Sequence, residues 1–499
     1  MLSLALALLG SSQEPVFEPR YELGQRVRAL ERAFFAEPPQ APGRAAQIQA
    51  AERAVERFFR GDFAGAAQAL DALPGTGPGT GWVLAPERRL ITADSEPLGL
   101  SLQRWYGPRE PVPEALSVRV GDEARALELR SATDLGATED LWRARLPLAG
   151  LPSGDLRLEL QIRFSAEGRG PLSQLPSGAT PPEPSLDPRG LLATRSLWLS
   201  LVPDLEPRLS ALQAGLAALD SSAPALEAAS LADHLALLRE LADGPAGETD
   251  FPAARLLADS EALLAAAARG ERWFTSERCG EHWLSVPTAK RPTRVRLWLP
   301  ADLAEPQPAH RPLVLALHGA GGSENLWFDG YGDGSIRRLC EQRGWILAAP
   351  RLGLLGGGAP EALPAALAER YPIDLSRVFV VGHSMGAARA LSLASGSPDL
   401  PAALVLLGGG RALRDPEPLR RLPIWIAAGE RDFGRPGAEA LFASLRRGEP
   451  TAPAEPAESP SDGQLQLWIA PEVEHLLIVP AALPPAFAWL DTLAARGTR

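Results

Sequence analysis

Cysteine and histidine are scarce in this sequence. It has two cysteines, Cys279 and Cys340, and six histidines that lie scattered without the spacing of metal ligands. Two cysteines cannot form a structural zinc site by themselves. They could make one bridge in an exported protein or remain two buried thiols, and we favour two unpaired core cysteines. We therefore expect neither a metal nor another cofactor.

Dense blocks of positive charge are also missing. Lysine and arginine number 50 against 61 aspartates and glutamates, which gives a net charge of −11. Binding to nucleic acid needs a basic face that contacts phosphates, and no arginine-containing stretch forms one. Beyond the N-terminus the sequence also lacks the uninterrupted apolar run of about 18 residues that a membrane-spanning helix needs. We expect no nucleic-acid partner and no membrane span.

The first 13 residues are a short apolar run followed by small residues. This order resembles the hydrophobic region and cleavage site of a secretory signal. A basic region before the apolar run is missing, so a frayed apolar tail is the alternative. We expect residues 1–13 to be a signal peptide and the protein to be periplasmic, attached to the cell envelope or secreted. If the segment is only a tail, the protein is cytoplasmic.

The chain of 499 residues is long enough for two to four domains. Apolar residues recur every three or four positions in residues 14–74, with a proline-rich break at 38–43, which predicts a helical hairpin region. Residues 82–203 alternate apolar and polar residues in several short runs, which predicts a small antiparallel β-sandwich as an accessory domain. Residues 204–270 return to helical periodicity and are interpreted as a helical connector.

Residues 271–499 alternate strand and helix patterns, which is typical of an α/β domain. Two predicted strands open this part, at 272–276 and 294–299. Six uninterrupted apolar strands follow, at 313–317, 345–349, 378–381, 403–407, 424–428 and 465–469. Such runs indicate a mostly parallel sheet with helices on both faces. The predicted fold class is therefore α/β, preceded by helical segments and the β-sandwich.

One stretch of this domain carries a chemical motif. The apolar strand at 378–381 runs through Gly382, His383, Ser384, Met385 and Gly386 into a helical pattern. A nucleophile elbow needs this order, because the sharp turn from strand to helix lifts a serine above the sheet and leaves room only for small neighbours. The five-residue match alone is weak in a chain with 47 glycines. The strand before it and the helix after it give it weight.

A serine needs a histidine as base and a carboxylate that orients the histidine. His475 is the histidine that follows Ser384 in the sequence, and it comes just after the last predicted strand. The turn after the strand at 424–428 offers Asp432, with Glu430 as a reserve and Asp415 as a more distant candidate. We predict Ser384, Asp432 and His475 as the catalytic residues.

The same chemistry needs two backbone N–H donors for the oxyanion. Met385, which follows the nucleophile, supplies one of them in this kind of site. The second is expected from the glycine-rich turn at 318–322, with Ala320 as the donor. His318 is then a structural histidine, and we expect His383 to face the sheet side of the elbow.

With these residues in place, residues 271–499 resemble the α/β-hydrolase domains of the polyhydroxybutyrate-depolymerase, feruloyl-esterase and prolyl-oligopeptidase-like group. The turn at 318–322, an Asp-x-x-Arg pattern at 374–377 before the elbow strand, the elbow itself, Asp432 and His475 carry the resemblance. It covers less than half of the chain, and it does not distinguish an ester from an amide substrate. Ala387 stands where many relatives have a further glycine.

Few residues separate the strands at 403–407 and 424–428, so no large lid is inserted there. We therefore expect an open site, which suits a polymer, a glycan-linked ester or a peptide. Trp327, after the oxyanion turn, could line a substrate pocket or simply pack in the core.

The leading hypothesis is a serine esterase that forms an acyl-enzyme on an exposed or polymeric ester. The first alternative is a prolyl-oligopeptidase-like serine peptidase, although no propeller repeat is visible. The second alternative is an exported binding or envelope protein with a vestigial hydrolase domain.

Overall fold

The structure is a computed structural model of the chain. It describes residues 16–38, 41–73, 81–93, 96–107, 112–120, 123–131, 140–164, 191–244, 248–288, 292–305, 309–353, 359–446 and 464–495. The expected signal peptide, residues 1–13, lies outside the described residues, so export stays a prediction.

The N-terminal region forms three helices, α1 (Pro19–Ala36), α2 (Arg44–Phe59) and α3 (Phe63–Asp71). Pro19 lies in the first turn of α1, where the N–H it lacks is not needed. The Asp62 carboxylate accepts a hydrogen bond from Gly65 N at 2.8 Å and caps α3. The two longer helices lie where the sequence pattern predicts a hairpin.

Nine strands form two packed sheets after these helices. They are β1 (Trp82–Pro86), β2 (Leu90–Thr92), β3 (Leu98–Arg104), β4 (Pro113–Val120), β5 (Glu123–Leu127), β6 (Leu129–Ser131), β7 (Leu141–Leu146), β8 (Gly154–Phe164) and β9 (Leu191–Val202). The strand orders are β1-β3-β7-β6 and β2-β9-β8-β4-β5. One apolar core lies between the sheets, which makes a sandwich. The pairing departs from the prediction in one place, because β2 runs parallel to β9.

The helices α4 (Leu205–Ala218), α5 (Ala225–Asp243) and α6 (Ala253–Ala268) connect the sandwich to a large C-terminal sheet. This sheet contains β10 (Gly280–Val286), β11 (Thr293–Leu299), β12 (Arg311–Leu317), β13 (Ile346–Pro350), β14 (Ile373–His383), β15 (Ala403–Leu407), β16 (Ile424–Gly429) and β17 (Leu465–Ala470). Its order is β10-β11-β13-β12-β14-β15-β16-β17. The strands from β12 onward pair in parallel, while β10 and β11 are antiparallel. The predicted α/β fold class is confirmed.

The first strand of this sheet lies later than predicted. Residues 272–276 form no strand, and β10 begins at Gly280 instead. The buried Glu227 carboxylate accepts hydrogen bonds from Trp273 N at 2.9 Å and Phe274 N at 3.3 Å. These amides are therefore used by a side chain of α5 and cannot enter a strand ladder.

The large sheet is covered on both faces. The helices of this part are α7 (Leu326–Asp329), α8 (Tyr331–Glu341), α9 (Leu363–Ala368), α10 (Met385–Gly396), α11 (Arg435–Arg446) and α12 (Ile478–Ala495). Along β12, Leu313, Leu315 and Leu317 face one core with α9 to α11 and α4 to α6, whereas Val314 and Ala316 face the other. This second core joins α8 and α12 to α1, α2 and α3.

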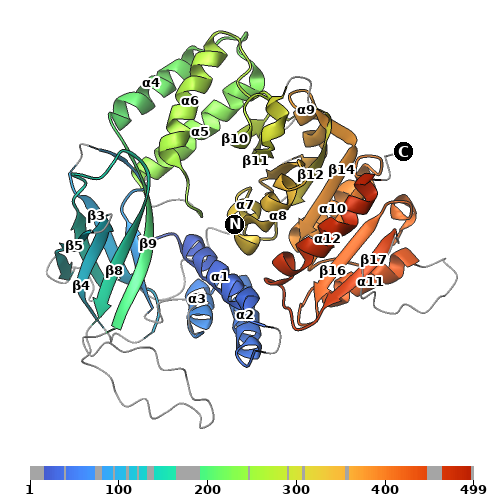
Figure 1. The fold of residues 1–499 in the computed structure, drawn as a ribbon, viewed down its shortest axis with the longest axis horizontal. Coiled ribbons are helices and arrows are strands. Elements are labelled where there is room, and N and C mark those ends of the chain that lie inside the picture. The colour runs from blue at the N-terminus through green and yellow to red at the C-terminus, as the bar shows by residue number, and fades with distance from the viewer. Residues whose placement is uncertain are drawn as a thin grey trace.

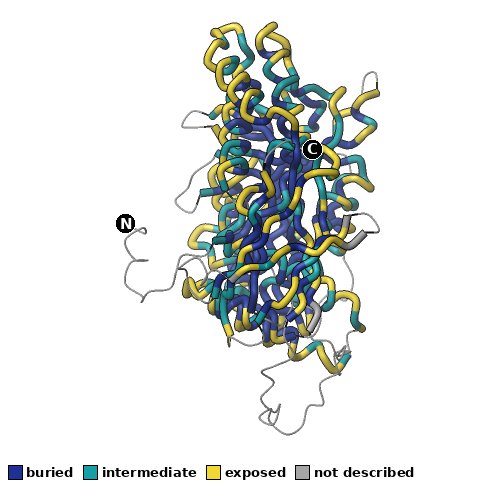
Figure 2. Tube along the Cα trace, turned by 90° about the vertical axis from the view of Figure 1, so that its left-hand side faces the viewer, coloured by how far each residue is buried: buried dark blue, intermediate teal, exposed yellow. Residues whose placement is uncertain are grey.

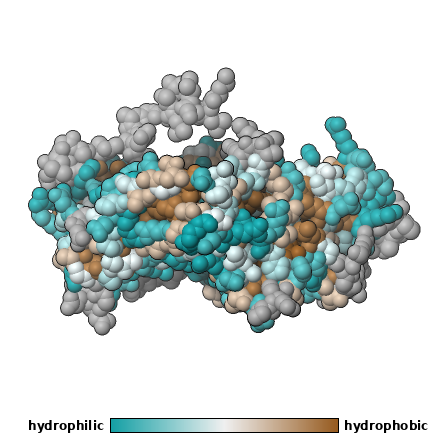
Figure 3. Space-filling model, turned by 90° about the horizontal axis from the view of Figure 1, so that it is seen from above, coloured by the Kyte–Doolittle hydropathy of each residue, from teal (hydrophilic) through white to brown (hydrophobic). Residues whose placement is uncertain are grey.

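The N-terminal helices thus share a core with the C-terminal sheet. In Figure 1 they lie between the β-sandwich and the large sheet, with α4 to α6 above. Figure 2 shows the buried residues along the interior of the molecule and the exposed residues on the outer sides of the helices. The face seen in Figure 3 shows hydrophobic residues in separate patches among hydrophilic ones.

Helix α12 is, among the described residues, long and apolar enough to cross a membrane by length and composition, with a mean hydropathy of 1.3. Phe487, Trp489 and Leu490 of this helix are almost completely buried in the core beside the sheet. Near its end, Asp491 pairs with Arg343 at 2.7 Å. We therefore interpret α12 as a core helix.

Both cysteines are free, as predicted. Cys340 is fully buried on α8, whereas Cys279 is half-buried before β10, so only one of them is a core thiol.

Candidate active site

The turn between β14 and α10 holds Ser384 in a backbone conformation that side chains rarely adopt. Its φ is 54° and its ψ is −115°. The turn is closed so tightly that a Cβ on Gly386 would lie 2.0 Å from the carbonyl oxygen of Leu317, and a Cβ on Gly382 would lie 2.4 Å from that of Gly386. Glycine is therefore required at both positions, and the stretch has the geometry of a nucleophile elbow.

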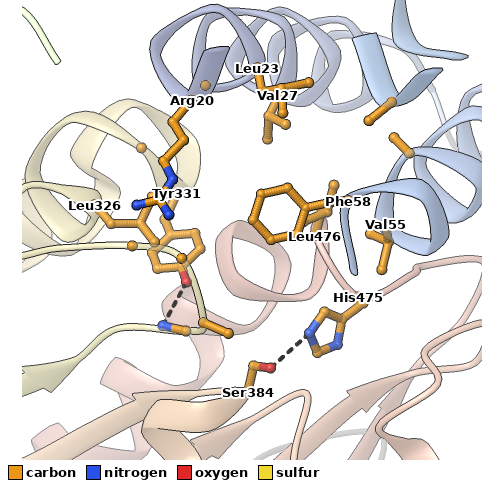
Figure 4. A pocket seen from close by; sticks show the side chains of 18 of the residues that line it. Arg20, Leu23, Val27, Val55, Phe58, Leu326, Tyr331, Ser384, His475 and Leu476 are labelled. Atoms are coloured by element: carbon orange, nitrogen blue, oxygen red, sulfur yellow. Dashed lines mark hydrogen bonds between the residues drawn. The ribbon is translucent and has the colours of Figure 1, made fainter. Parts of the chain in front are cut away.

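Three side chains meet at the carboxyl ends of the parallel strands. The distance between Ser384 Oγ and His475 Nε2 is 3.0 Å (Figure 4). On the other side of the imidazole, His475 Nδ1 lies 2.7 Å from Asp432 Oδ1. Ser384 follows β14, Asp432 follows β16 and His475 follows β17. The structure brings together the serine, the aspartate and the histidine that the sequence predicts, in hydrogen-bonding order.

This strand order and this elbow define a fold. The C-terminal part of the chain has the α/β-hydrolase fold.

Asp432 is held in the charged form. Burial works to raise its pKa, but the hydrogen bond from His475 and the Gly434 N–H at 2.7 Å hold the pKa of Asp432 below its usual value. The two other candidate carboxylates lie elsewhere. Glu430 is exposed and accepts a bond from Glu472 N at 3.2 Å, and Asp415 accepts one from Glu417 N at 3.1 Å.

Gly408 is a member of the site that sequence reasoning missed. It follows β15 with a φ of +58°. A Cβ at this position would lie 3.0 Å from Asp432 Oδ2 and 3.1 Å from His475 Nδ1. The run of three glycines directly after a buried strand, residues 408–410, is the signal that could have indicated it.

The expected oxyanion donors occupy the expected places. Ala320 lies in the turn after β12 and lines the cavity above Ser384. Met385 is the first residue of α10. In the described part of the chain, neither amide donates a hydrogen bond to a protein acceptor. Two backbone N–H groups next to the serine are thus free for a ligand oxygen.

A buried hydrogen-bond network lies behind these groups. The Tyr331 hydroxyl donates to His383 Nδ1 at 2.6 Å and accepts from Gly319 N at 3.4 Å. His383 Nε2 donates to the carbonyl oxygen of His475 at 3.1 Å. Burial lowers the pKa of His383 to about 3, so the ring stays neutral. The network connects the elbow, the oxyanion turn and the loop that carries His475.

His318 also has a structural environment. Its Nδ1 donates to the carbonyl oxygen of Gly319 at 2.8 Å, and its Nε2 accepts from Leu352 N at 3.0 Å. Because one ring nitrogen accepts from an amide, the ring is neutral, and burial lowers its pKa to about 4. His318 lies away from the serine and holds the oxyanion turn.

A cavity of about 180 Å³ lies over Ser384. Its floor is the oxyanion turn with Ser384, His383 and His475, and its roof comes from the N-terminal helices (Figure 4). We call α1, α2 and α3 the cap. The cap lines the cavity mainly with apolar side chains, among them Leu23, Val27, Ala54, Val55, Phe58 and Leu70.

The expectation of an open site is therefore wrong. The link between β15 and β16 is short, as the sequence shows, but the cover comes from residues 19–71 instead. The cap packs closely on the oxyanion turn, since a Cβ on Gly321 of that turn would lie 2.7 Å from the ring of Phe58 in α2.

Trp327 does not line this cavity, so the alternative in which it lines a substrate pocket is wrong and the one in which it packs in the core is right. Its side chain is fully buried in the core, with its ring 4.7 Å from that of Tyr331. The neighbouring Leu326 and the ring of Tyr331 line the cavity instead. Successive side chains of a helix point in directions about 100° apart, so Leu326 faces the cavity while Trp327 faces the core.

Buried charges fix the cap to the rest of the molecule. Arg26 of α1 contacts Asp71 at 2.9 Å and Glu22 at 2.7 Å, and Tyr106 of the sandwich also donates to Asp71. On the other side, Glu31 of α1 accepts from Gly332 N at 2.8 Å. The cap is thus joined to both the sandwich and the hydrolase domain.

No model of a protein family matches this sequence, and no curated protein matches it. Several solved structures are similar to it. A serine-to-alanine variant of the feruloyl esterase module from Clostridium thermocellum, complexed with sinapinate, is 13% identical, with 43% of this chain and 90% of that chain covered and a TM-score of 0.35.

Two further similar structures are hydrolases by name. An S-formylglutathione hydrolase from Agrobacterium tumefaciens is 16% identical, with 42% and 94% of the two chains covered and a TM-score of 0.33. A thermostable esterase is 13% identical, with 82% and 96% covered and a TM-score of 0.32.

Proposed function

We propose that this chain is a serine esterase that hydrolyses small carboxylic esters through an acyl-enzyme. The observation that carries the proposal is the continuous line of hydrogen bonds from Ser384 Oγ through His475 to Asp432 at an elbow that opens into a cavity. A serine hydroxyl at 3.0 Å from a histidine that a carboxylate orients is the arrangement that activates it as a nucleophile.

In the first half of the reaction, His475 Nε2 takes the proton of Ser384 as Oγ attacks the ester carbonyl carbon. The charge that develops on the carbonyl oxygen is stabilised by the N–H groups of Ala320 and Met385. The ionised Asp432 stabilises the imidazolium that forms. His475 then gives the proton to the leaving alcohol, and water hydrolyses the acyl-enzyme by the same route.

The cap defines the substrates we propose. Its apolar side chains and the cavity volume of about 180 Å³ suit a short apolar acyl group. A polymeric acyl part would have to pass beneath the cap helices, so we propose small esters in place of the polymeric ones.

The test uses p-nitrophenyl esters of increasing acyl length beside the matching p-nitroanilides. We expect ester turnover, with rates that fall once the acyl chain exceeds the cavity, and a loss of about a thousandfold or more in Ser384→Ala. Ser392→Ala is the matched control, because Ser392 lies exposed on the same helix, α10. Turnover of the anilides alone would assign the peptidase function instead, and activity that survives Ser384→Ala would refute the proposal.

A further inference from the structure

Two exposed aromatic side chains lie beside the proposed base. Phe59, at the end of α2, is 56% exposed, and Phe433, in the loop after β16, is 59% exposed. Their rings are in edge-to-face contact with centroids 5.9 Å apart. The ring of Phe433 also lies 4.0 Å from the ring of His475. Exposing two phenylalanines costs the chain apolar burial, so their place next to His475 needs an explanation.

These side chains form the walls of an open groove. The groove, which we call the His475 groove, is lined by Val55, Phe59, Asp432, Phe433 and His475, together with further charged residues. Val55, Phe59 and His475 also line the cavity that contains Ser384. The cavity and the groove therefore adjoin each other, with Val55, Phe59 and His475 as their common wall.

The chemistry of the proposed reaction decides what reaches this groove. When the tetrahedral intermediate collapses, the bond from the carbonyl carbon to the alcohol oxygen breaks, and that oxygen takes the proton from His475 Nε2. The alcohol part of the ester must therefore lie on the His475 side while the acyl part lies in the cavity. A group beyond the first carbon of the alcohol can then reach the groove past Val55 and Phe59, which line both recesses.

We propose that Phe59 and Phe433 form a second subsite, which binds an aromatic ring on the alcohol part of the ester. This inference rests on the proposed esterase function. A planar ring can contact the face of one phenylalanine and the edge of the other, because the two are nearly perpendicular, at 86°.

The charges at the groove favour an uncharged alcohol. Arg60 is paired with Glu56 at 2.5 Å, and Arg431 lies 3.8 Å from Glu52. Glu430 adds a further carboxylate at the edge. Carboxylates outnumber arginines in the lining of the groove, so an alcohol with a carboxylate of its own is disfavoured.

The experiment compares benzyl acetate with ethyl acetate, which share the acyl group and have alcohols of similar acidity. We expect the wild type to hydrolyse the benzyl ester with the higher kcat/KM. Because Phe59 also lines the cavity, the readout in Phe59→Ala is the ratio of the two esters: kcat/KM for benzyl acetate should fall about three- to tenfold more than kcat/KM for ethyl acetate, the effect of one aromatic contact. Phe35→Ala is the control, because Phe35 is exposed on α1 and lines neither recess.

A second readout does not depend on turnover of these esters. Benzyl alcohol should inhibit p-nitrophenyl acetate hydrolysis competitively, and Phe59→Ala should weaken this inhibition whereas Phe59→Leu should weaken it less. The melting temperature of each variant shows that the variant is folded.

The outcomes separate the two proposals. The subsite is overturned, and the esterase stands, if the wild type hydrolyses p-nitrophenyl esters through Ser384 but has the same kcat/KM for both acetates. The same conclusion follows if Phe59→Ala lowers kcat/KM for the two acetates by the same factor. If no ester is hydrolysed in a Ser384-dependent way, the esterase proposal fails and the subsite fails with it.

Discussion

The floor and the roof of the cavity above Ser384, its lower and upper walls, are held in place by different forces. The lower wall is backbone: at the elbow an added Cβ would collide with a carbonyl oxygen, in the oxyanion turn it would meet side chains such as that of Phe58, and at Gly408 it would press on Asp432 and His475. The upper wall is the apolar side of the cap, which is fixed by side-chain packing and by the buried ion pairs of Arg26. The lower wall therefore tolerates few substitutions, whereas the upper wall can change residue by residue and so set which substrates fit.

The largest expected effect is on the lower wall. Asp432→Asn should lower kcat about ten-thousandfold, because the amide no longer stabilises the imidazolium and can impose the wrong tautomer on His475. The measurement is kcat on a p-nitrophenyl ester, with Glu430→Gln as the matched control. A larger loss in Glu430→Gln would move the acid of the triad to the reserve carboxylate.

The next effect tests what holds the upper wall. Arg26→Leu leaves Asp71 and Glu22 as buried, uncompensated carboxylates, so the free energy of unfolding should fall by about 3 to 5 kcal/mol. Urea titration gives this quantity. Arg32 lies on the same helix as Arg26 and forms an exposed ion pair with Asp333 of α8. Arg32→Ala should therefore lower the free energy of unfolding by less than about 1 kcal/mol. Equal losses in the two variants would mean that the buried network does not fix the cap.

A smaller effect compares two glycines with similar backbone. Gly408→Ala should lower kcat about ten- to a hundredfold, because the new methyl group presses on Asp432 and His475. Gly107→Ala has the same left-handed strain, with φ +83° and open space around it, and should affect stability alone. If both variants keep the kcat of the wild type, a methyl group at position 408 does not displace Asp432 or His475, and the prediction is contradicted.

The smallest effect concerns a charge of the upper wall. Burial raises the pKa of Glu31 to about 7, against 4.5 in an unfolded chain, with Asp333 opposing its charge and Arg28 and Arg32 favouring it. Because the folded protein keeps this proton up to a higher pH than the unfolded chain does, the free energy of unfolding falls as pH rises from about 4.5 to 7. Glu31→Gln should therefore be as stable as the wild type near pH 5 and about 1 to 3 kcal/mol more stable at pH 8. Equal stability at both pH values would contradict this.

The sequence predicted the lower wall well because its residues follow strand ends. Parallel strands place their carboxyl ends at one edge of a sheet, so Ser384, Asp432 and His475 could be brought together from order alone. Gly408 was missed because its role is to leave space, and an absent side chain leaves little trace in a single sequence.

The upper wall could not be predicted in this way. Periodicity shows that α1 and α2 have apolar faces, but it does not say which surface those faces cover. The same limit explains Trp327, whose ring turns into the core while Leu326 faces the cavity. The misplaced strand at 272–276 depends on Glu227, a partner distant in sequence whose carboxylate takes the amides of Trp273 and Phe274.

The core shared by the cap and the large sheet bears on how this protein can be dissected. A fragment beginning at residue 271 would carry every residue of the proposed triad, yet it would expose the apolar surface that α1, α2 and α3 now cover. Such a surface favours aggregation. The shortest chain that keeps the catalytic machinery soluble therefore includes both ends of the sequence, and a split or permuted version should supply the cap together with the hydrolase domain.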